Sequence, residues 1–369
     1  MPTRHSFQKP DFIFLITLGI IIAFGLLMLA SASVPLSQEK FGTSYYYLKS
    51  QILRGLLPGL ALFIIGYLLP YRFWKKFALL GLILGIVSLI AVFIPGLGLG
   101  EGGASRWLNF GLFSLQPSEF LKLAFIIYLA AWFDSKEKTI KSFSNSFVPF
   151  MILIGVLAVL LLFQPDIGTL GVISLIGMTM YFLAGARLLY FPIILGGGGI
   201  LIYILTKIFP HALNRVTVFL HPGTDPKGIG YQLNQALLAI GSGGFFGRGL
   251  GQSVQKFKYL PEPSTDSILA VIGEELGFFG ILLLLILFGI LIFRGFRIAR
   301  LAPDNFARYL ASGIISWIAI QALINTAAIS GLLPLTGITL PFISLGGSSL
   351  TACLAGMGIL LNISKYSKN

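Results

Sequence analysis

The chain has 369 residues, of which 56% are apolar and only 11% are charged, and its mean hydropathy is +0.90. A soluble globular protein carries about 25% charged residues, so the composition excludes a string of soluble domains. The net charge of +13 would suit nucleic acid, but such proteins gather their cations on one polar face, and no polar domain exists here to carry one. A single cysteine excludes a disulfide framework and a cysteine-rich metal site. We therefore expect an integral membrane protein without a nucleic-acid partner.

Apolar runs of about 20 residues can cross a bilayer as helices, and the chain contains ten stretches that approach this length. We predict an all-α, polytopic fold, because open sheets cannot span lipid and long apolar runs do not alternate as barrel strands do. Residues 1–369 form one membrane domain, with a large outer loop between the seventh and eighth spans. The expected spans are Phe12–Val34, Leu48–Leu69, Phe77–Ile94, Phe120–Phe133, Phe147–Phe163, Leu170–Ala184, Leu188–Phe209, Ile268–Phe293, Leu310–Ile329 and Leu350–Ile363.

The positions of the charges predict the orientation of these spans. With ten spans both termini lie on one side, and assigning that side to the cytoplasm places most Lys and Arg residues in short inner loops, where membrane insertion favours them. Few carboxylates share that side, and these are Asp11, Asp134, Glu137 and Asp304. The other carboxylates fall outside or in the outer ends of helices. Because the insertion rule does not govern carboxylates, their gathering there suggests a functional site.

Ionisable residues at membrane depth are functional candidates, because each costs several kcal/mol unless it is paired or hydrated. Glu119 and Lys122 stand three residues apart at the outer start of the fourth span, on one helix face where they can pair. Asp166 lies at the turn between the fifth and sixth spans, and Asp266 lies at the outer entrance of the eighth. The structural alternatives are a buried ion pair for the first two and helix caps or turns for the aspartates.

Two glutamates, Glu274 and Glu275, follow Asp266 two helical turns deeper. A carboxylate isolated there would tend to be protonated, so we expect hydrogen-bonded structural roles for both. A metal site formed by His211, His221 and Asp225 is a further alternative, although loop histidines are usually bystanders.

Cations on the outer side oppose the insertion rule, so their presence there suggests an anionic partner such as a phosphorylated lipid headgroup. A proton or ion pathway is the rival interpretation. These cations are Arg106, Lys122, Arg215, Lys227, Arg248, Lys256 and Lys258.

Five ordered motifs covering nearly the whole chain resemble the SEDS family (shape, elongation, division and sporulation). They read SRWLNFGLFSLQPSEFLKL, FQPDIGTLG, YQLNQALLAIGSGGFFGRGLG, KFKYLPEPSTDSILAVIGEELG and PLTGITLPFISLGGSS. The fourth motif is more like the division branch, FtsW, than the elongation branch, RodA. Where many division members have His-Thr-Asp-Phe, this chain has Ser-Thr-Asp-Ser at 264–267, which keeps the aspartate and leaves the roles of its neighbours in doubt.

The resemblance implies a ten-span peptidoglycan glycosyltransferase of the bacterial cytoplasmic membrane, with its active site facing the periplasm or cell exterior. Such enzymes join lipid II units with inversion at the donor sugar. Asp266 is then the expected general base, and Arg106, Lys122 and Arg215 are expected to stabilise the departing pyrophosphate. Glu119 would orient Lys122 or hold a divalent cation, Mg²⁺ or Mn²⁺. The other expected substrate contacts are Asp166, Lys256 and Lys258.

The expected partners are lipid II, membrane lipid, a class B penicillin-binding protein with transpeptidase activity, and other proteins of the division or elongation machinery. A lipid II translocase or another ion-coupled transporter is the main alternative function, and a non-catalytic scaffold is a third. A translocase needs access from both faces of the membrane, whereas the polar candidates here gather on one side. The sequence therefore favours the enzyme.

Overall fold

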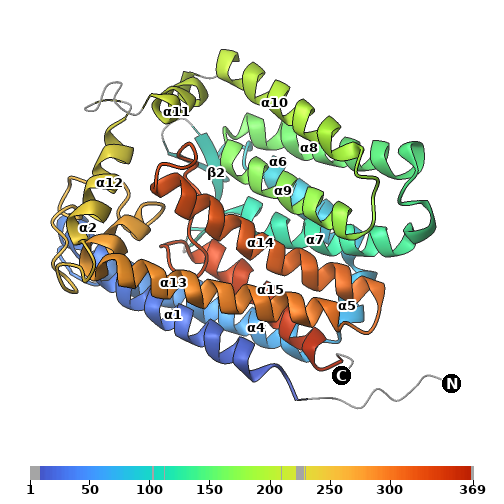
Figure 1. Cartoon of the computed structure of the whole chain (residues 1–369), viewed down its shortest axis with the longest axis horizontal. Coiled ribbons are helices and arrows are strands. Elements are labelled where there is room, and N and C mark those ends of the chain that lie inside the picture. Colours follow the sequence, from blue (N-terminus) through green and yellow to red (C-terminus); the bar gives the residue numbers. More distant parts are fainter. Residues whose placement is uncertain are drawn as a thin grey trace.

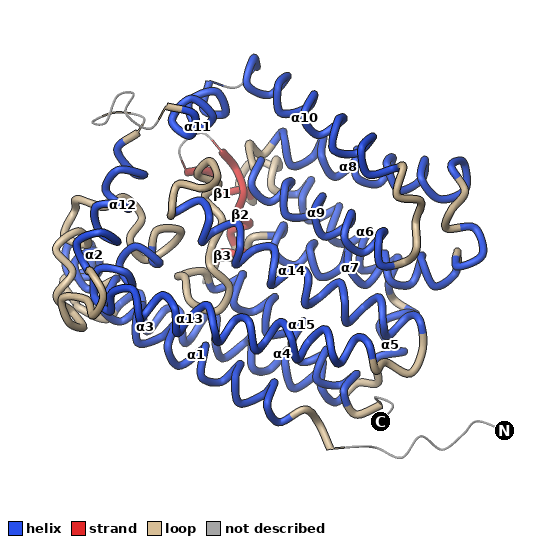
Figure 2. Tube along the Cα trace, viewed as in Figure 1, coloured by secondary structure: helices blue, strands red, loops and turns tan. Residues whose placement is uncertain are grey.

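A computed structural model describes residues 9–101, 104–111, 113–208, 210–221, 228 and 230–366. Long helices run side by side through the molecule, and the start of α1 (Phe12–Ala32) lies at the same end as the end of α15 (Gly347–Ser364) (Figure 1). The strands and the helices α2 (Val34–Phe41) and α12 (Tyr231–Gly243) lie at the opposite end, which we call the distal end (Figures 1 and 2).

Each of the ten expected spans lies on a helix or on helices in direct succession, which confirms a multi-pass helical membrane protein. Among the described residues, six helical stretches are long and apolar enough to cross a membrane, and shorter apolar helices are α6 (Ala78–Ala91), α9 (Ile167–Leu183) and part of α10 (Tyr190–Ile208). The six are Phe12–Ala32, Tyr46–Leu68, Phe143–Phe163, Ile268–Arg300, Asn305–Ile329 and Gly347–Ser364.

Several of these stretches are composite. A π-helical turn, Ile52–Leu56, joins α3 (Tyr46–Gln51) to α4 (Leu57–Leu68), and another, Phe143–Phe147, precedes α8 (Val148–Phe163). The remaining helices are α1 (Phe12–Ala32), α5 (Tyr71–Lys76), α6 (Ala78–Ala91), α7 (Pro117–Ser135), a 3₁₀ turn (Glu137–Thr139), α9 (Ile167–Leu183), α10 (Tyr190–Ile208), α11 (Pro210–Leu220), α13 (Ile268–Arg300), α14 (Asn305–Ile329) and α15 (Gly347–Ser364).

The core of the bundle is built around α14 and α15. Helix α15 packs along α4, and α14 packs against α7, α9 and α13. Small residues permit this close approach, as expected where lipid offers no hydrophobic force between helices. At Gly358, for example, an added Cβ would lie 2.2 Å from the carbonyl oxygen of Phe63. The two helices therefore form a rigid frame for the loops at the distal end.

The segment between α6 and α7 corrects the all-α prediction, because it forms a small antiparallel sheet. Its strands are β1 (Gly98–Glu101), β2 (Ala104–Asn109) and β3 (Ser114–Leu115), in the order β1-β2-β3. The sheet is short and lies at the distal end (Figure 2). The glycine-rich sequence of this segment lacks the apolar alternation that predicts a strand. The sequence therefore predicts an irregular outer loop here.

The expected inner carboxylates pair with inner cations near the termini. Arg294 contacts Asp11 at 2.6 Å, and Arg72 lies 3.6 Å from Asp304. Asp134 forms an ion pair with Lys75. These contacts give three of those carboxylates a structural role at the end remote from the strands.

Candidate active site

The carboxylate of Asp266 lies at the distal end, just before α13. Ser267 is the N-cap residue of this helix and makes no side-chain capping bond, so Asp266 does not serve as the cap. Its Oδ2 accepts a hydrogen bond from Nε2 of Gln232 at 3.2 Å, and its Oδ1 lies 3.5 Å from Oγ1 of Thr265. Burial, followed by the nearby charge of Glu262, raises the pKa of Asp266 to about 6. A carboxylate with this pKa is well placed to accept a proton near neutral pH.

The backbone around Asp266 is fixed by α14 and by the connector between α14 and α15, residues 330–346. Nδ2 of Asn325, on α14, donates to the carbonyl oxygen of Asp266 at 2.9 Å and to that of Ile338 at 2.8 Å. Oγ of Ser344 donates to the carbonyl of Thr265 at 2.6 Å. The loop that carries Asp266 is thus hydrogen-bonded to α14 and to the connector that follows it, both distant in sequence.

Glu119 and Lys122 form the pair that their spacing predicts. Nζ of Lys122 lies 2.8 Å from Oε1 of Glu119 and 2.9 Å from Oε1 of Gln321 on α14, and it lies over the ring of Trp317. The two residues are 5% and 1% exposed, respectively. Gln321 also donates to the carbonyl of Thr339 at 3.0 Å. Since Asn325 is one turn further along α14, this pair and Asp266 are anchored to the same connector.

Arg215 lies in charge range of both candidate aspartates and of Arg106. The charges of Arg106, Asp266 and Asp166 all act on the Arg215 guanidinium, so the structure brings these four predicted residues together. Each arginine also has a backbone partner. Nε of Arg106 donates to the carbonyl of Gln164 at 3.0 Å, and Nη1 of Arg215 donates to the carbonyl of Thr336 at 3.3 Å.

Asp166 caps α9, as one of the sequence alternatives states. Its Oδ1 accepts a hydrogen bond from the backbone N–H of Thr169 at 3.1 Å. Its Oδ2 is buried without a hydrogen-bond partner among the described residues, and the carboxylate lies in charge range of Arg215.

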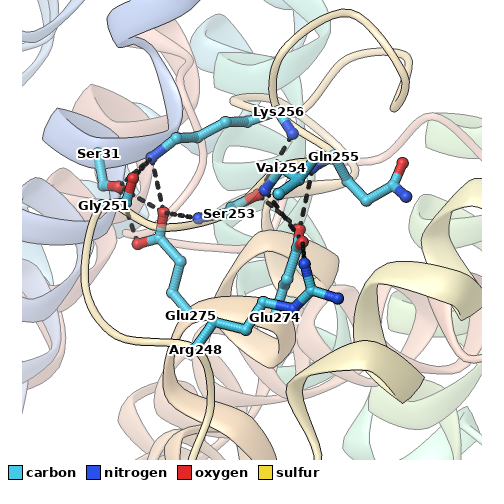
Figure 3. Close-up of polar contacts among 9 residues, drawn as sticks. All are labelled: Ser31, Arg248, Gly251, Ser253, Val254, Gln255, Lys256, Glu274 and Glu275. Atoms are coloured by element: carbon cyan, nitrogen blue, oxygen red, sulfur yellow. Dashed lines mark hydrogen bonds and ion pairs between the residues drawn. The ribbon is translucent and has the colours of Figure 1, made fainter.

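Lys256 is buried and lies in a polar cluster with Ser31, Gly251 and Glu275 (Figure 3). Its Nζ contacts Oε1 of Glu275 at 2.8 Å, the carbonyl oxygen of Gly251 at 2.8 Å and Oγ of Ser31, on α1, at 2.9 Å. All three N–H groups of the ammonium have acceptors. The structure therefore gives Lys256 a role in holding the loop, and its contact with substrate remains a sequence prediction that this geometry does not favour.

Glu274 holds the next part of the same loop (Figure 3). Its carboxylate accepts hydrogen bonds from Oγ of Ser253 at 2.6 Å, from N of Val254 at 3.0 Å and from N of Gln255 at 3.2 Å. Arg248 approaches it at 3.5 Å. Glu274 and Glu275 are both fully buried, and the prediction that they are hydrogen-bonded structural groups is confirmed.

Lys258 is exposed and forms an ion pair with Glu39 on α2, with Nζ 2.8 Å from Oε1. Nothing in this contact distinguishes it from an ordinary surface pair, which contributes little to stability.

The described residues contain no group of three or more His, Cys, Asp or Glu side chains that could hold a metal. Asp225 and Lys227 lie outside these residues, as does the side chain of His211. At Glu119, the Lys122 ammonium occupies one oxygen and brings a positive charge to the carboxylate. The orientation of Lys122 by Glu119 fits this geometry. The other carboxylate oxygen, Oε2, is buried without a hydrogen-bond partner among the described residues, and the role of Glu119 at a divalent cation stays a prediction.

Three polar residues at this end were missed by sequence reasoning: Gln232, Gln321 and Asn325. They are uncharged amides within helices, so neither the cost of a buried charge nor the positive-inside rule singles them out. Gln232 lies within the third of the quoted motifs, whereas Gln321 and Asn325 lie in none of the five.

The comparison with known families decides the assignment. The family described as "cell cycle protein", which groups FtsW, RodA and SpoVE, matches residues 11–369. The chain belongs to this family.

Relatives with full-length matches include members of two branches of the FtsW/RodA/SpoVE family. Stage V sporulation protein E of Bacillus subtilis is 44% identical, over 100% of each chain. A probable peptidoglycan glycosyltransferase FtsW of Trichlorobacter lovleyi is 42% identical, over 96% of this chain and 93% of the relative.

Solved structures of the FtsW/RodA/SpoVE family share the fold. RodA of Thermus thermophilus matches with a TM-score of 0.70 and 27% identity, over 98% of this chain and 99% of its own. A chain from a peptidoglycan synthase complex, described as coordinating polymerization and crosslinking, matches with a TM-score of 0.79 and 26% identity, over 96% and 98%. The FtsW relative is thus more similar in sequence than the RodA structure, in agreement with the predicted branch.

Proposed function

We propose that this protein is a peptidoglycan glycosyltransferase that polymerises lipid II, with Asp266 as the general base. The observation that carries the proposal is the Asp266 carboxylate, which is held at the distal end with a pKa raised to about 6 and lies near the cation Arg215. The names of the FtsW relatives, which are about 40% identical over nearly the whole chain, support the reaction class.

In the proposed step, Asp266 removes the proton from the acceptor 4-hydroxyl. The hydroxyl oxygen then bonds to the anomeric carbon of the donor, while the bond from that carbon to the pyrophosphate oxygen breaks. The pyrophosphate leaves with the bonding electrons, and a single displacement converts an α-linked donor into a β-1,4 product. General-base assistance contributes roughly 10²–10⁴-fold to such a rate.

Negative charge develops on the departing pyrophosphate. Arg215 lies in charge range of Asp266, Asp166 and Arg106, and guanidinium groups suit phosphate oxygens through paired N–H donors. Lys122, oriented by Glu119, is the third cation of the proposal. A divalent cation remains an expectation to be tested with EDTA; Mg²⁺ commonly binds through substrate phosphates and few protein ligands.

We place ten spans in the bacterial cytoplasmic membrane, with both termini in the cytoplasm and the distal end outside. The basic residues near the termini support this orientation under the positive-inside rule. A class B penicillin-binding protein is the proposed partner, supported by the match to a chain of a peptidoglycan synthase complex.

The test is incubation of the purified full-length chain with labelled lipid II and Mg²⁺ or Mn²⁺, followed by electrophoresis of the glycan products. Wild-type protein should give ladders and Asp266→Asn should not, although both fold in detergent. Equal polymerisation by the variant would overturn the assignment of the base. Movement of lipid II across vesicle membranes without polymer would instead support the translocase.

A further inference from the structure

Gln232 is the side chain on α12 that contacts the Asp266 carboxylate. Its Nε2 donates to Oδ2 of Asp266 and to Oγ of Ser267, both at 3.2 Å. An amide nitrogen has two N–H groups, so both are used at the start of α13. The amide is therefore held in one orientation.

The direction of this bond depends on the charge of the aspartate. An ionised carboxylate only accepts hydrogen bonds, and a donor facing it favours the charged form. If the amide were turned over, its oxygen would face the carboxylate, an arrangement that suits only protonated Asp266. The contact thus selects the form that can act as a base.

Helix α12 is well suited to hold this donor in place. At its other end, an added Cβ on Gly243 would lie 1.9 Å from the carbonyl oxygen of Gly273 on α13. The two helices touch through backbone there, and Gln232 reaches the Asp266 carboxylate from the same helix. The donor therefore rests on a rigid contact and not on a free loop.

Other charged groups act on Asp266 in both directions. Burial and Glu262, on its own loop, favour the protonated acid, whereas Arg215, on α11, favours the carboxylate. Arg106, on β2, lowers the pKa of the Arg215 guanidinium, whereas Asp166, just before α9, raises it. Gln232 differs from these groups because it is uncharged and donates a hydrogen bond directly to the Asp266 carboxylate.

We propose that Gln232 is a positioning residue that keeps Asp266 ionised and oriented for proton abstraction, with Oδ2 held by the amide and Oδ1 left to act as the base. This inference rests on the proposed function. It assigns Gln232 no contact with substrate, because its action is exerted through Asp266.

The test compares Gln232→Met with Gln235→Met in the full-length protein, using lipid II polymerisation rates between pH 5 and 8. Methionine has a similar length and no donor. Gln235 lies one turn along α12, and its side chain has no hydrogen bond within the described part of the chain. Gln232→Met should move the acid limb of the profile upward by about 0.5–1 pH unit, so that its deficit is large at pH 6 and small at pH 8. Gln235→Met should keep the wild-type limb.

Gln232→Glu provides a second, nearly isosteric variant, and it should move the limb upward as well because a like charge is added beside Asp266. A limb that is unchanged in Gln232→Met would overturn the inference, as would a loss of rate that is equal at every pH. Failure of the proposed function looks different, since wild-type protein would then form no polymer at any pH.

Discussion

Nζ of Lys256 lies 2.8 Å from Oε1 of Glu275, and the two side chains are 3% and 0% exposed. The pair joins the loop that follows α12 to the second turn of α13, and Ser31 connects it to α1. One ion pair therefore ties together α1, α13 and the loop that follows α12.

Removing one partner of this pair should be more harmful than removing both. Glu275→Gln leaves a buried ammonium without its counter-charge, and breaking a buried pair in this way costs about 3–5 kcal/mol. The double variant Glu275→Gln with Lys256→Met removes both charges and should recover a large part of that loss. Thermal unfolding of the single and double variants in detergent measures this coupling. Strictly additive losses would contradict it.

Gly277 permits the break within α13 at the distal end. Its φ of +68° and ψ of −163° lie in a region that is essentially restricted to glycine. An added Cβ would lie 2.4 Å from N of Gly247 and 2.5 Å from the carbonyl oxygen of Phe245.

Gly277→Ala should therefore destabilise the protein by more than about 2 kcal/mol, from backbone strain together with the clash. Gly289→Ala in the same helix is the control, because an added Cβ there meets nothing within 4 Å. Melting temperatures of the two variants check this prediction, and similar values for both would show that the break does not need glycine.

The helices of the fold were predictable because long apolar runs leave few alternatives in lipid. The pairing of Glu119 with Lys122 was predictable for a local reason: three residues along a helix bring side chains together whatever the tertiary fold. The sheet around β2 was not predictable, because its register depends on contacts and not on an alternating pattern. Gly98, for instance, packs against the carbonyl of Val92.

The assembly of the candidate site could be predicted only in part. Motif resemblance pointed to Asp266, but its partners Gln232 and Asn325 lie 34 and 59 residues away, and neutral amides have no signal in charge or periodicity. For Lys256, the sequence indicated a cation on the outer side and could not show that Glu275 and Ser31 enclose it. Tertiary contacts decide whether a cation faces a substrate or the core.

The pH dependence of polymerisation should report the Asp266 carboxylate. Because the base must be deprotonated, the rate should rise with pH and reach half of its plateau near pH 6, the value to which burial raises this pKa. Initial rates of ladder formation between pH 4.5 and 8, with folding checked at each pH, measure it. An acid limb near pH 4 would mean that Asp266 titrates like a solvent-exposed aspartate.

Asp266→Asn should separate activity from stability. The pKa of Asp266 is raised in the folded protein, so the ionised form is disfavoured there relative to the unfolded chain. The contribution of the protonated Asp266 side chain to the free energy of unfolding is fully present below about pH 4. It is lost as the pH rises through about 6, where the carboxylate ionises in the folded protein. An amide at this position escapes that loss, so at pH 7.5 the variant should be more stable by about 1–2 kcal/mol while its polymerisation rate falls by roughly 10²–10⁴-fold. The gain in melting temperature should shrink toward pH 4.

Asp11→Asn is the contrasting control, because Asp11 caps α1 and pairs with Arg294, so its loss should lower the melting temperature. A variant Asp266→Asn that is less stable than wild type at pH 7.5 would contradict the raised pKa.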